Sequence, residues 1–353
     1  MALSIKKRSS KAAKSVVGLD LDPAHVAAAE VDVNGVVAVK RGAVKPLAGG
    51  VLRDGEVTDA PALTAAIEEL WAEHDLPKTV RLGIANQRIV VRTLDMPVLE
   101  DPKALDAAVR LEAPDHVPMP MDEAVLDFQP LGIVDTPAGP RQQVVVVAVR
   151  REMVARYMDA VRAAGLKIEG VDLSAFALVR SMYNKLQDED ASGVLWVNVA
   201  GLTNVAVTCG SHCLFTRAAA GGLDSMVQTL ADRRGLTAEH SAAWLGHVGL
   251  ETELDAVEGD PDIVAAARAV LEEGAHQLAD TVRNSLNFYR MQQNAAAVER
   301  AVLTGPAVAI PAITRLLSEQ LGIVVEGRTV AQHGEVPNAT SLAVAAGLAV
   351  EAI

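Results

Sequence analysis

Residues Val194–Ala219, VLWVNVAGLTNVAVTCGSHCLFTRAA, contain three short apolar runs separated by turn residues. Runs of β-branched residues bounded by Gly, Ser and Asn are typical of consecutive antiparallel strands. The first turn, 200–204, would gather backbone N–H groups and the Thr203 hydroxyl around one point, and such a row of amides can hold a phosphate. An ordinary hairpin turn would explain the same residues, so this stretch alone leaves both interpretations open.

A second stretch near the N-terminus repeats the pattern. Residues Val16–Lys40, VVGLDLDPAHVAAAEVDVNGVVAVK, again indicate a strand, a tight turn, a strand, an Asn-Gly turn and a strand. An amphipathic helix is predicted after each triplet, at about 60–74 and 223–234. Two copies of β-β-β-α indicate an internal duplication. Two such α/β lobes around a common cleft resemble the actin-like (ribonuclease H-like) duplicated fold.

The length and charge of the chain restrict its class. With 353 residues the chain exceeds one typical domain. Its net charge of −13 argues against nucleic acid as a partner, because binding a phosphate backbone needs a basic surface. Residues 1–15 are predicted to be a flexible basic tail. We find neither a secretory signal nor an apolar stretch that would span a bilayer, so we expect a cytoplasmic protein. Cys209 and Cys213 are therefore expected to be unpaired.

Motifs in the middle and the second half of the chain carry a more specific signal. The segment 96–131 contains a Pro…Glu-Ala…Val-Pro-x-Pro…Leu-Asp-Phe series that is similar to a signature of the PilM family. The helix at Arg283–Arg290, RNSLNFYR, is similar to that family's Arg-Ser-Leu-Asp-Phe-Tyr helix. The chain therefore resembles PilM, the cytoplasmic actin-like family of type IV pilus assembly, over nearly its whole length, and more distantly the cell-division protein FtsA. The signature residues are Pro97, Glu112-Ala113, Val117-Pro118-Met119-Pro120 and Leu126-Asp127-Phe128.

The resemblance implies four subdomains. The first lobe would be subdomain 1A, interrupted by an insert in the 1C position of FtsA and PilM rather than the 1B position of actin. The second lobe would be 2A, with a helical 2B after its first helix, and the last helix is a candidate to pack on 1A. Within the insert, 132–140 is predicted to be a loop. The boundaries that we expect are 16–85 and 166–190 for 1A, 86–165 for 1C, 191–234 and 299–353 for 2A, and 235–298 for 2B.

The resemblance also implies an ATP and Mg²⁺ site in the cleft between the lobes. Asp20 stands where the family has the aspartate of its first phosphate loop, whose implied role is to hold a Mg²⁺-bound water. The second loop would be the turn at 200–204. The residues that would bind the cofactor are Asp20, Asn198, Gly201, Thr203, Asn204, Gly222 and Gly305.

Several of these positions depart from the family pattern. Asp22 and Pro23 stand where the family has small residues, and Asp22 puts a negative charge where a phosphate would lie. Proline removes an amide donor. Asn198 replaces an aspartate and Pro306 interrupts a run of glycines, although Mg²⁺ depends on carboxylate and phosphate oxygens. We therefore predict that ATP hydrolysis is lost, that ATP binding is weak or lost, and that the protein is not an enzyme.

The resemblance further implies protein partners at the membrane. In the PilM family the N-terminal peptide of the inner-membrane protein PilN lies extended in a groove between 1A and 1C, a mode that supplies main-chain hydrogen bonds and side-chain pockets. We expect a scaffold, peripheral at the inner face of the cell membrane, that reaches it only through a PilN-like protein. The pilus platform and its motor ATPase are further candidate partners. The candidate groove residues are Glu112, Val117, Pro118 and Phe128.

Two other functions remain open at this point. An FtsA-like ATP-dependent filament protein would end in a basic amphipathic helix, whereas residues 341–353, SLAVAAGLAVEAI, contain no Lys or Arg. A small-molecule kinase of the actin-like superfamily would need a general base near its substrate, and no residue stands out as one. We rank the scaffold first, the filament second and the kinase third.

Overall fold

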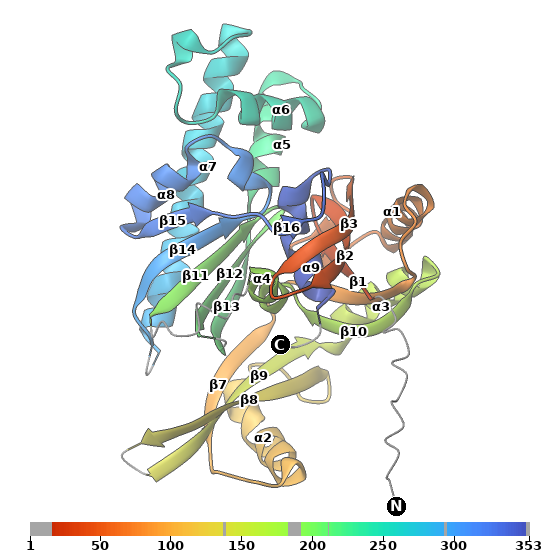
Figure 1. Cartoon of the computed structure of the whole chain (residues 1–353), viewed down its shortest axis with the longest axis vertical. Coiled ribbons are helices and arrows are strands. Elements are labelled where there is room, and N and C mark those ends of the chain that lie inside the picture. Colours follow the sequence, from red (N-terminus) through yellow and green to blue (C-terminus); the bar gives the residue numbers. More distant parts are fainter. Residues whose placement is uncertain (1–15, 137–138, 183–191, 211, 293–294, 351–353) are drawn as a thin grey trace, which may run out of the picture.

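The structure, a computed structural model, describes residues 16–136, 139–182, 192–210, 212–292 and 295–350. Two mixed sheets lie side by side, a smaller sheet with one helix lies at the lower end, and helices project at the upper end (Figure 1). The predicted basic tail, 1–15, lies outside the described residues. None of the helices in the described ranges combines the length and apolarity needed to cross a bilayer.

The first lobe is built on a six-stranded sheet with the strand order β10-β6-β1-β2-β3-β16. Apolar side chains of β1 and β2 pack under helices α1 and α3, and this core includes the fully buried Tyr157. A short hairpin, β4-β5, comes between β3 and α1 in the sequence. The bounds are β1 Val17–Asp22, β2 His25–Val33, β3 Val37–Pro46, β4 Leu52–Arg53, β5 Glu56–Val57, α1 Ala60–Glu73, β6 Thr79–Ile84, α3 Arg151–Ala163, β10 Lys167–Leu173, α4 Ser174–Met182 and β16 Ala331–Gln332.

The second lobe repeats this arrangement. Its five-stranded sheet has the order β13-β12-β11-β14-β15, so each strand matches one of the first sheet, with β11 in the place of β1. In both sheets the first three strands pair antiparallel and the next two pair parallel. The bounds are β11 Gly193–Val199, β12 Leu202–Cys209, β13 His212–Ala220, α5 Leu223–Arg234, α6 Ala238–Val248, η2 Leu254–Ala256, α7 Pro261–Arg290, β14 Val298–Thr304, η3 Pro306–Ala309, α8 Ile313–Leu321, β15 Val324–Gly327, η4 Ala339–Leu342 and α9 Ala343–Leu348.

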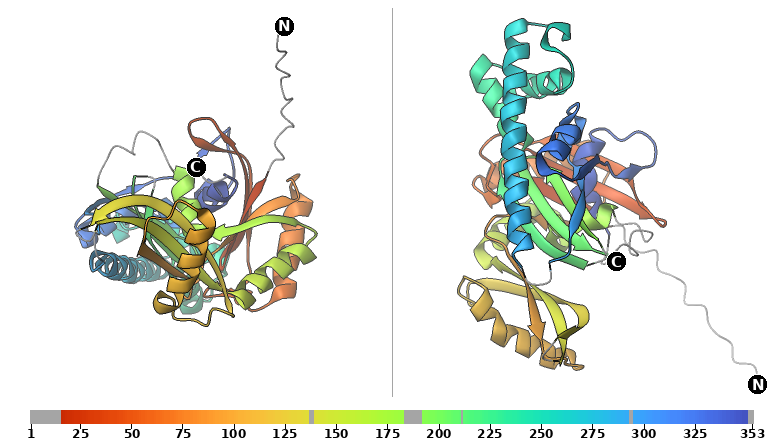
Figure 2. Two further views of the ribbon diagram at one scale, coloured as in Figure 1. Left: turned by 90° about the horizontal axis from the view of Figure 1, so that it is seen from below. Right: turned by 90° about the vertical axis from the view of Figure 1, so that its left-hand side faces the viewer.

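This equivalence confirms the predicted duplicated fold. Figure 2 shows α7 running from the second sheet to the upper end of the molecule, where α6 accompanies it. One face of α7 is buried along its length, against α5 and α6 and then against the sheet. Helix α8 begins only at Ile313, because Ala312 has a left-handed backbone (φ 63°) that separates η3 from α8.

The lobes exchange their last helices. Helix α4 follows the first sheet in sequence, yet its Ala177 and Leu178 pack with Trp196 of the second sheet. Helix α9 ends the second half, yet Ala345 and other residues of this helix pack on the first sheet. The two helices also contact each other closely: a Cβ on Gly347 would lie 1.7 Å from the Ala177 carbonyl oxygen. Because β16 of the second half also pairs with β3, the halves are interlocked.

The insert forms a three-stranded sheet, β7-β9-β8, with α2 on one face. Residues 132–136 and 139–140 belong to the long β8-β9 hairpin, so the prediction of a loop at 132–140 was wrong for them, and 137–138 are outside the described residues. Residues 132–136 of that hairpin, GIVDT, do not alternate between apolar and polar types, so the sequence did not indicate a strand there. The bounds are β7 Val90–Met96, α2 Pro102–His116, β8 Ala124–Thr136 and β9 Gly139–Arg150.

Helix α3 closes the predicted insert range 86–165, and it contacts β9 of the insert sheet but packs mainly in the first lobe. Its Met153, Tyr157, Ala160 and Val161 lie in the core of the first lobe, against α1. The three-stranded sheet and α2 therefore form the structural unit that projects from the lobe.

Candidate functional site

Two turns from opposite lobes meet in the cleft. The turn between β1 and β2 carries Asp22, and the turn between β11 and β12 carries Gly201. One oxygen of the Asp22 carboxylate accepts hydrogen bonds from the backbone N–H groups of Gly201 (2.7 Å) and Ala24 (2.9 Å), and the other accepts one from Leu202 (3.1 Å). Asp22 is only 5% exposed. The amides that the sequence suggested for a phosphate thus bind a carboxylate of the same chain.

Asp20, the candidate Mg²⁺ residue, lies deep in the same region. It is 6% exposed, and its carboxyl accepts a hydrogen bond from the Ser174 hydroxyl at 3.3 Å. Burial, followed by the nearby charge of Asp22, raises the pKa of Asp20 to about 8. Without a bound cation, the carboxyl group of Asp20 therefore favours its protonated form near neutral pH. Within the described ranges, no group of three or more His, Cys, Asp and Glu is arranged to hold a metal ion.

Two further titratable groups lie beside Asp22. His25 is buried, and its Nδ1 lies 3.9 Å from the Asp22 carboxylate. Burial lowers the pKa of His25 despite that carboxylate, so the imidazole is neutral at pH 7. Asp224, at the start of α5, has a pKa raised by burial and then by the charge of Asp22. The surroundings of the two turns therefore offer carboxyl groups rather than cations.

The other candidate cofactor residues gather around the second turn, where most of their groups are already engaged. The Asn198 side-chain oxygen accepts a hydrogen bond from the Thr304 hydroxyl (3.0 Å), and the Thr203 hydroxyl donates to the Gly221 carbonyl (2.7 Å). Gly222 and Gly305 allow close backbone packing, since a Cβ there would lie 2.2 Å from the Ala200 oxygen and 2.5 Å from the Val199 oxygen, respectively. Asn204 is buried and lines a cavity of only about 20 Å³.

A larger groove separates the insert from the first lobe. Its volume is about 400 Å³. One wall is the face of the insert sheet opposite α2, and the other is formed mainly by β10 and α4, with Ile84 of β6 and Val154 of α3. The main lining residues are Val125, Asp127, Phe128, Val145, Val147 and Val149 on the insert side, and Val171, Asp172, Leu173, Phe176 and Arg180 on the lobe side.

Of the four residues predicted for this groove, Phe128 alone lines it, and its side chain also packs against the apolar cluster under α2. Val117 is buried beneath α2 in a cluster with Val90. Glu112 lies on the exposed side of α2, 3.5 Å from His116. Pro118 lines a different hollow of about 510 Å³ between the insert and the second lobe.

The sequence contains a signal for the groove that the prediction missed. The run at 144–149 is continuously apolar, whereas a strand with one solvent-facing side alternates. Val144, Val146 and Ala148 pack toward α2, and Val145, Val147 and Val149 face the groove. A strand with apolar residues on both faces is normally covered on both faces. Helix α2 of the insert covers one face of β9, and the other face lines the groove.

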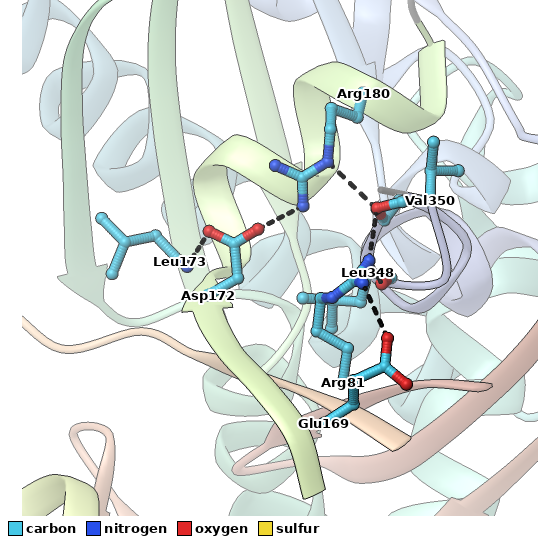
Figure 3. A network of polar contacts seen from close by, with 8 residues as sticks. Arg81, Glu169, Asp172, Leu173, Arg180, Leu348 and Val350 are labelled. Atoms are coloured by element: carbon cyan, nitrogen blue, oxygen red, sulfur yellow. Dashed lines mark hydrogen bonds and ion pairs between the residues drawn. The ribbon is translucent and has the colours of Figure 1, made fainter. Parts of the chain in front are cut away.

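An arginine network supports the lobe side of the groove (Figure 3). Arg180 of α4 points toward Asp172 of β10 and pairs with it, and its Nε donates to the Gly347 carbonyl (3.2 Å). Arg81 donates to the carbonyls of Leu348 (3.1 Å) and Val350 (2.7 Å). The network fixes β6, β10 and α4 against the C-terminal end of the described chain.

Comparison with known proteins agrees with this architecture. Among solved structures, a PilM–PilN type IV pilus biogenesis complex has 27% sequence identity to this chain and a TM-score of 0.74, and the match covers 95% of this chain and 97% of that one. EutJ from Carboxydothermus hydrogenoformans (17%, TM-score 0.51, 95% and 88% covered) and MreB5 of Spiroplasma citri bound to ADP (10%, 0.54, 94% and 94%) share the fold. A family model described as type IV pilus assembly protein PilM matches residues 18–353, and the chain belongs to that family.

Proposed function

We propose that this chain is a cytoplasmic scaffold of type IV pilus assembly that binds the N-terminal segment of a PilN-like membrane protein in the groove between the insert and the first lobe. The groove is the observation that carries the proposal, because it is mainly apolar, lies between the insert and the first lobe, and is open to solvent. Membership in the PilM family and similarity to a PilM–PilN complex support the choice of partner. The chain would then reach the membrane through this partner.

The walls of the groove suit an extended peptide. Among the described residues, β8 and β10 are edge strands of their sheets, so no strand of that part of the chain pairs with one side of each. An extended segment can pair with such an edge while its alternate side chains enter pockets. The lining valines and Phe176 would receive aliphatic side chains of the peptide.

The charges of the groove suggest a feature of the peptide. Arg180 is paired with Asp172, so neither charge is available to a ligand without breaking that ion pair. Asp127 is exposed, and in the described part of the chain its carboxylate makes no ion pair. A lysine or arginine next to the aliphatic residues of the peptide would complement Asp127.

The test is calorimetric titration with a synthetic N-terminal peptide of the PilN-like protein from the same organism. Val147→Asp places a charge in the apolar wall, and we expect it to weaken binding more than tenfold, equivalent to about 1.4 kcal/mol. Leu111→Asp is the matched control, because Leu111 is 82% exposed on α2, away from the groove. Equal affinity of wild type and Val147→Asp, with both folded by circular dichroism, would contradict the proposal.

A further inference from the structure

We propose that the Asp22 carboxylate is a built-in substitute for the nucleotide phosphate of the actin-like fold, and that it holds the two lobes together without a ligand. This inference rests on the turns in the cleft and does not depend on peptide docking. In this proposal the anion that the amides of the second turn bind is the carboxylate of Asp22.

The hydrogen bonds of Asp22 are those of a bound anion. Three backbone N–H groups converge on one carboxylate, and two of them, from Gly201 and Leu202, belong to the opposite lobe. Converging amides are the usual donors to phosphate in such turns. Hydrogen bonds to an ionised acceptor are about twice as strong as neutral ones, and a buried carboxylate without them would be costly. Asp22 therefore joins positions about 180 residues apart in sequence.

The space between the turns is also filled. A Cβ on Gly201 would lie 2.4 Å from the Asp22 oxygen, 2.7 Å from the Ala24 nitrogen and 3.1 Å from the Pro23 Cβ. The two turns are thus in direct contact, and the glycine is needed for that approach. A phosphate could enter only if Asp22 left its three donors and the turns separated.

The electrostatic surroundings oppose a nucleotide as well. A triphosphate would bring several negative charges next to Asp22 and Asp224, in a buried region where like charges repel strongly. The nearest imidazole, His25, has a pKa lowered by burial, so it supplies no positive charge at pH 7. The residues present therefore do not fit ATP with Mg²⁺.

The first experiment measures amide exchange at the second turn. Asp22→Asn keeps the shape of the side chain but loses the charge and turns one acceptor into a donor. We expect hydrogen exchange at Gly201 and Leu202 to become at least about tenfold faster, since hydrogen bonds to a charged group are stronger than those to a neutral one. Asp232→Asn is the control, because Asp232 is exposed in the last turn of α5, and it should leave exchange at these amides unchanged.

The second experiment asks whether an external anion can replace the carboxylate. Inorganic phosphate should raise the melting temperature of Asp22→Ala and leave that of wild type unchanged, while wild type should show no heat of binding with Mg-ATP. Micromolar Mg-ATP binding by wild type would overturn the proposal. The same conclusion would follow if phosphate affected both proteins alike, or if Gly201 and Leu202 exchanged at equal rates in wild type and Asp22→Asn. Peptide affinity, measured on the same variants, reports on the groove separately.

Discussion

The cleft and the groove are both formed at a boundary between structural units, yet their contents differ. In the cleft, Asp22 satisfies the amides of the opposite turn, and glycines let the backbones touch. In the groove, valines and Phe176 face a volume of about 400 Å³. The comparison teaches that a boundary closes where polar groups of the two units satisfy one another, whereas a boundary lined by apolar side chains keeps a groove.

The largest effect that we expect comes from Gly347 in α9, at the back of the cleft. A Cβ there would lie 1.7 Å from the Ala177 oxygen, so Gly347→Ala should lower the free energy of unfolding by more than about 3 kcal/mol. Alanine is intrinsically favoured over glycine in a helix by about 1 kcal/mol. The sign of the change in the free energy of unfolding, measured by urea denaturation, therefore tests the packing.

Gly246 provides the matched control for that prediction. It also lies in a helix, α6, but a Cβ there would meet nothing within 4 Å. Gly246→Ala should therefore stabilise the protein by about 0.5–1 kcal/mol. Destabilisation by both substitutions to a similar degree would mean that α4 and α9 do not pack as closely as described.

The second effect is a pH dependence that originates in the cleft. Burial raises the pKa of Asp20 from 3.8 to about 8, so between these values the folded state keeps a proton that the unfolded chain releases. The free energy of unfolding should then fall as the pH rises through this window, by up to about 1.4 kcal/mol per pH unit from this group. Asp20→Asn, which stays neutral, should flatten the slope in urea denaturation between pH 5.5 and 7.5. An unchanged slope would show that Asp20 ionises normally.

The third effect is confined to the groove. Phe176→Ala removes a half-buried ring from its wall, and we expect about tenfold weaker binding of the PilN-like peptide, or about 1.4 kcal/mol. Phe288→Ala is the control, because Phe288 is 42% exposed on α7 and lines the hollow on the other side of the insert. Equal losses for both variants by calorimetry would place the peptide elsewhere.

The smallest effect concerns the arginine network beside the groove (Figure 3). Arg81→Gln removes the bonds from the guanidinium to the Leu348 and Val350 carbonyls, and should cost about 1 kcal/mol in the free energy of unfolding. Arg53→Gln, at an exposed position of the β4-β5 hairpin, should change it by less than about 0.5 kcal/mol. If the two substitutions cost the same, Arg81 does not hold the C-terminal end in place.

The sequence predicted the parts of this molecule that depend on local pattern. Three β-rich runs followed by an amphipathic helix occur twice, and both copies fold as expected. The addition of β16 to the first sheet was missed, because Ala331–Gln332 is too short to show any period. The negative charge of Asp22 and the amides of the second turn were both noticed in the sequence, but two of the donors to Asp22 lie about 180 residues away, so no local pattern shows that the two features meet.

The exchange of helices between the lobes has a consequence for synthesis on the ribosome. The N-terminal half is made first, but its sheet gains β16 and its cover α9 only when residues 331–348 have been added. Until then Ala27, Ala29 and Val39 would face water, and contacts of such long sequence separation form slowly. The sheet of the nascent first half therefore stays incompletely covered until nearly the whole chain has been made. We expect the protein to depend most on chaperones during this interval.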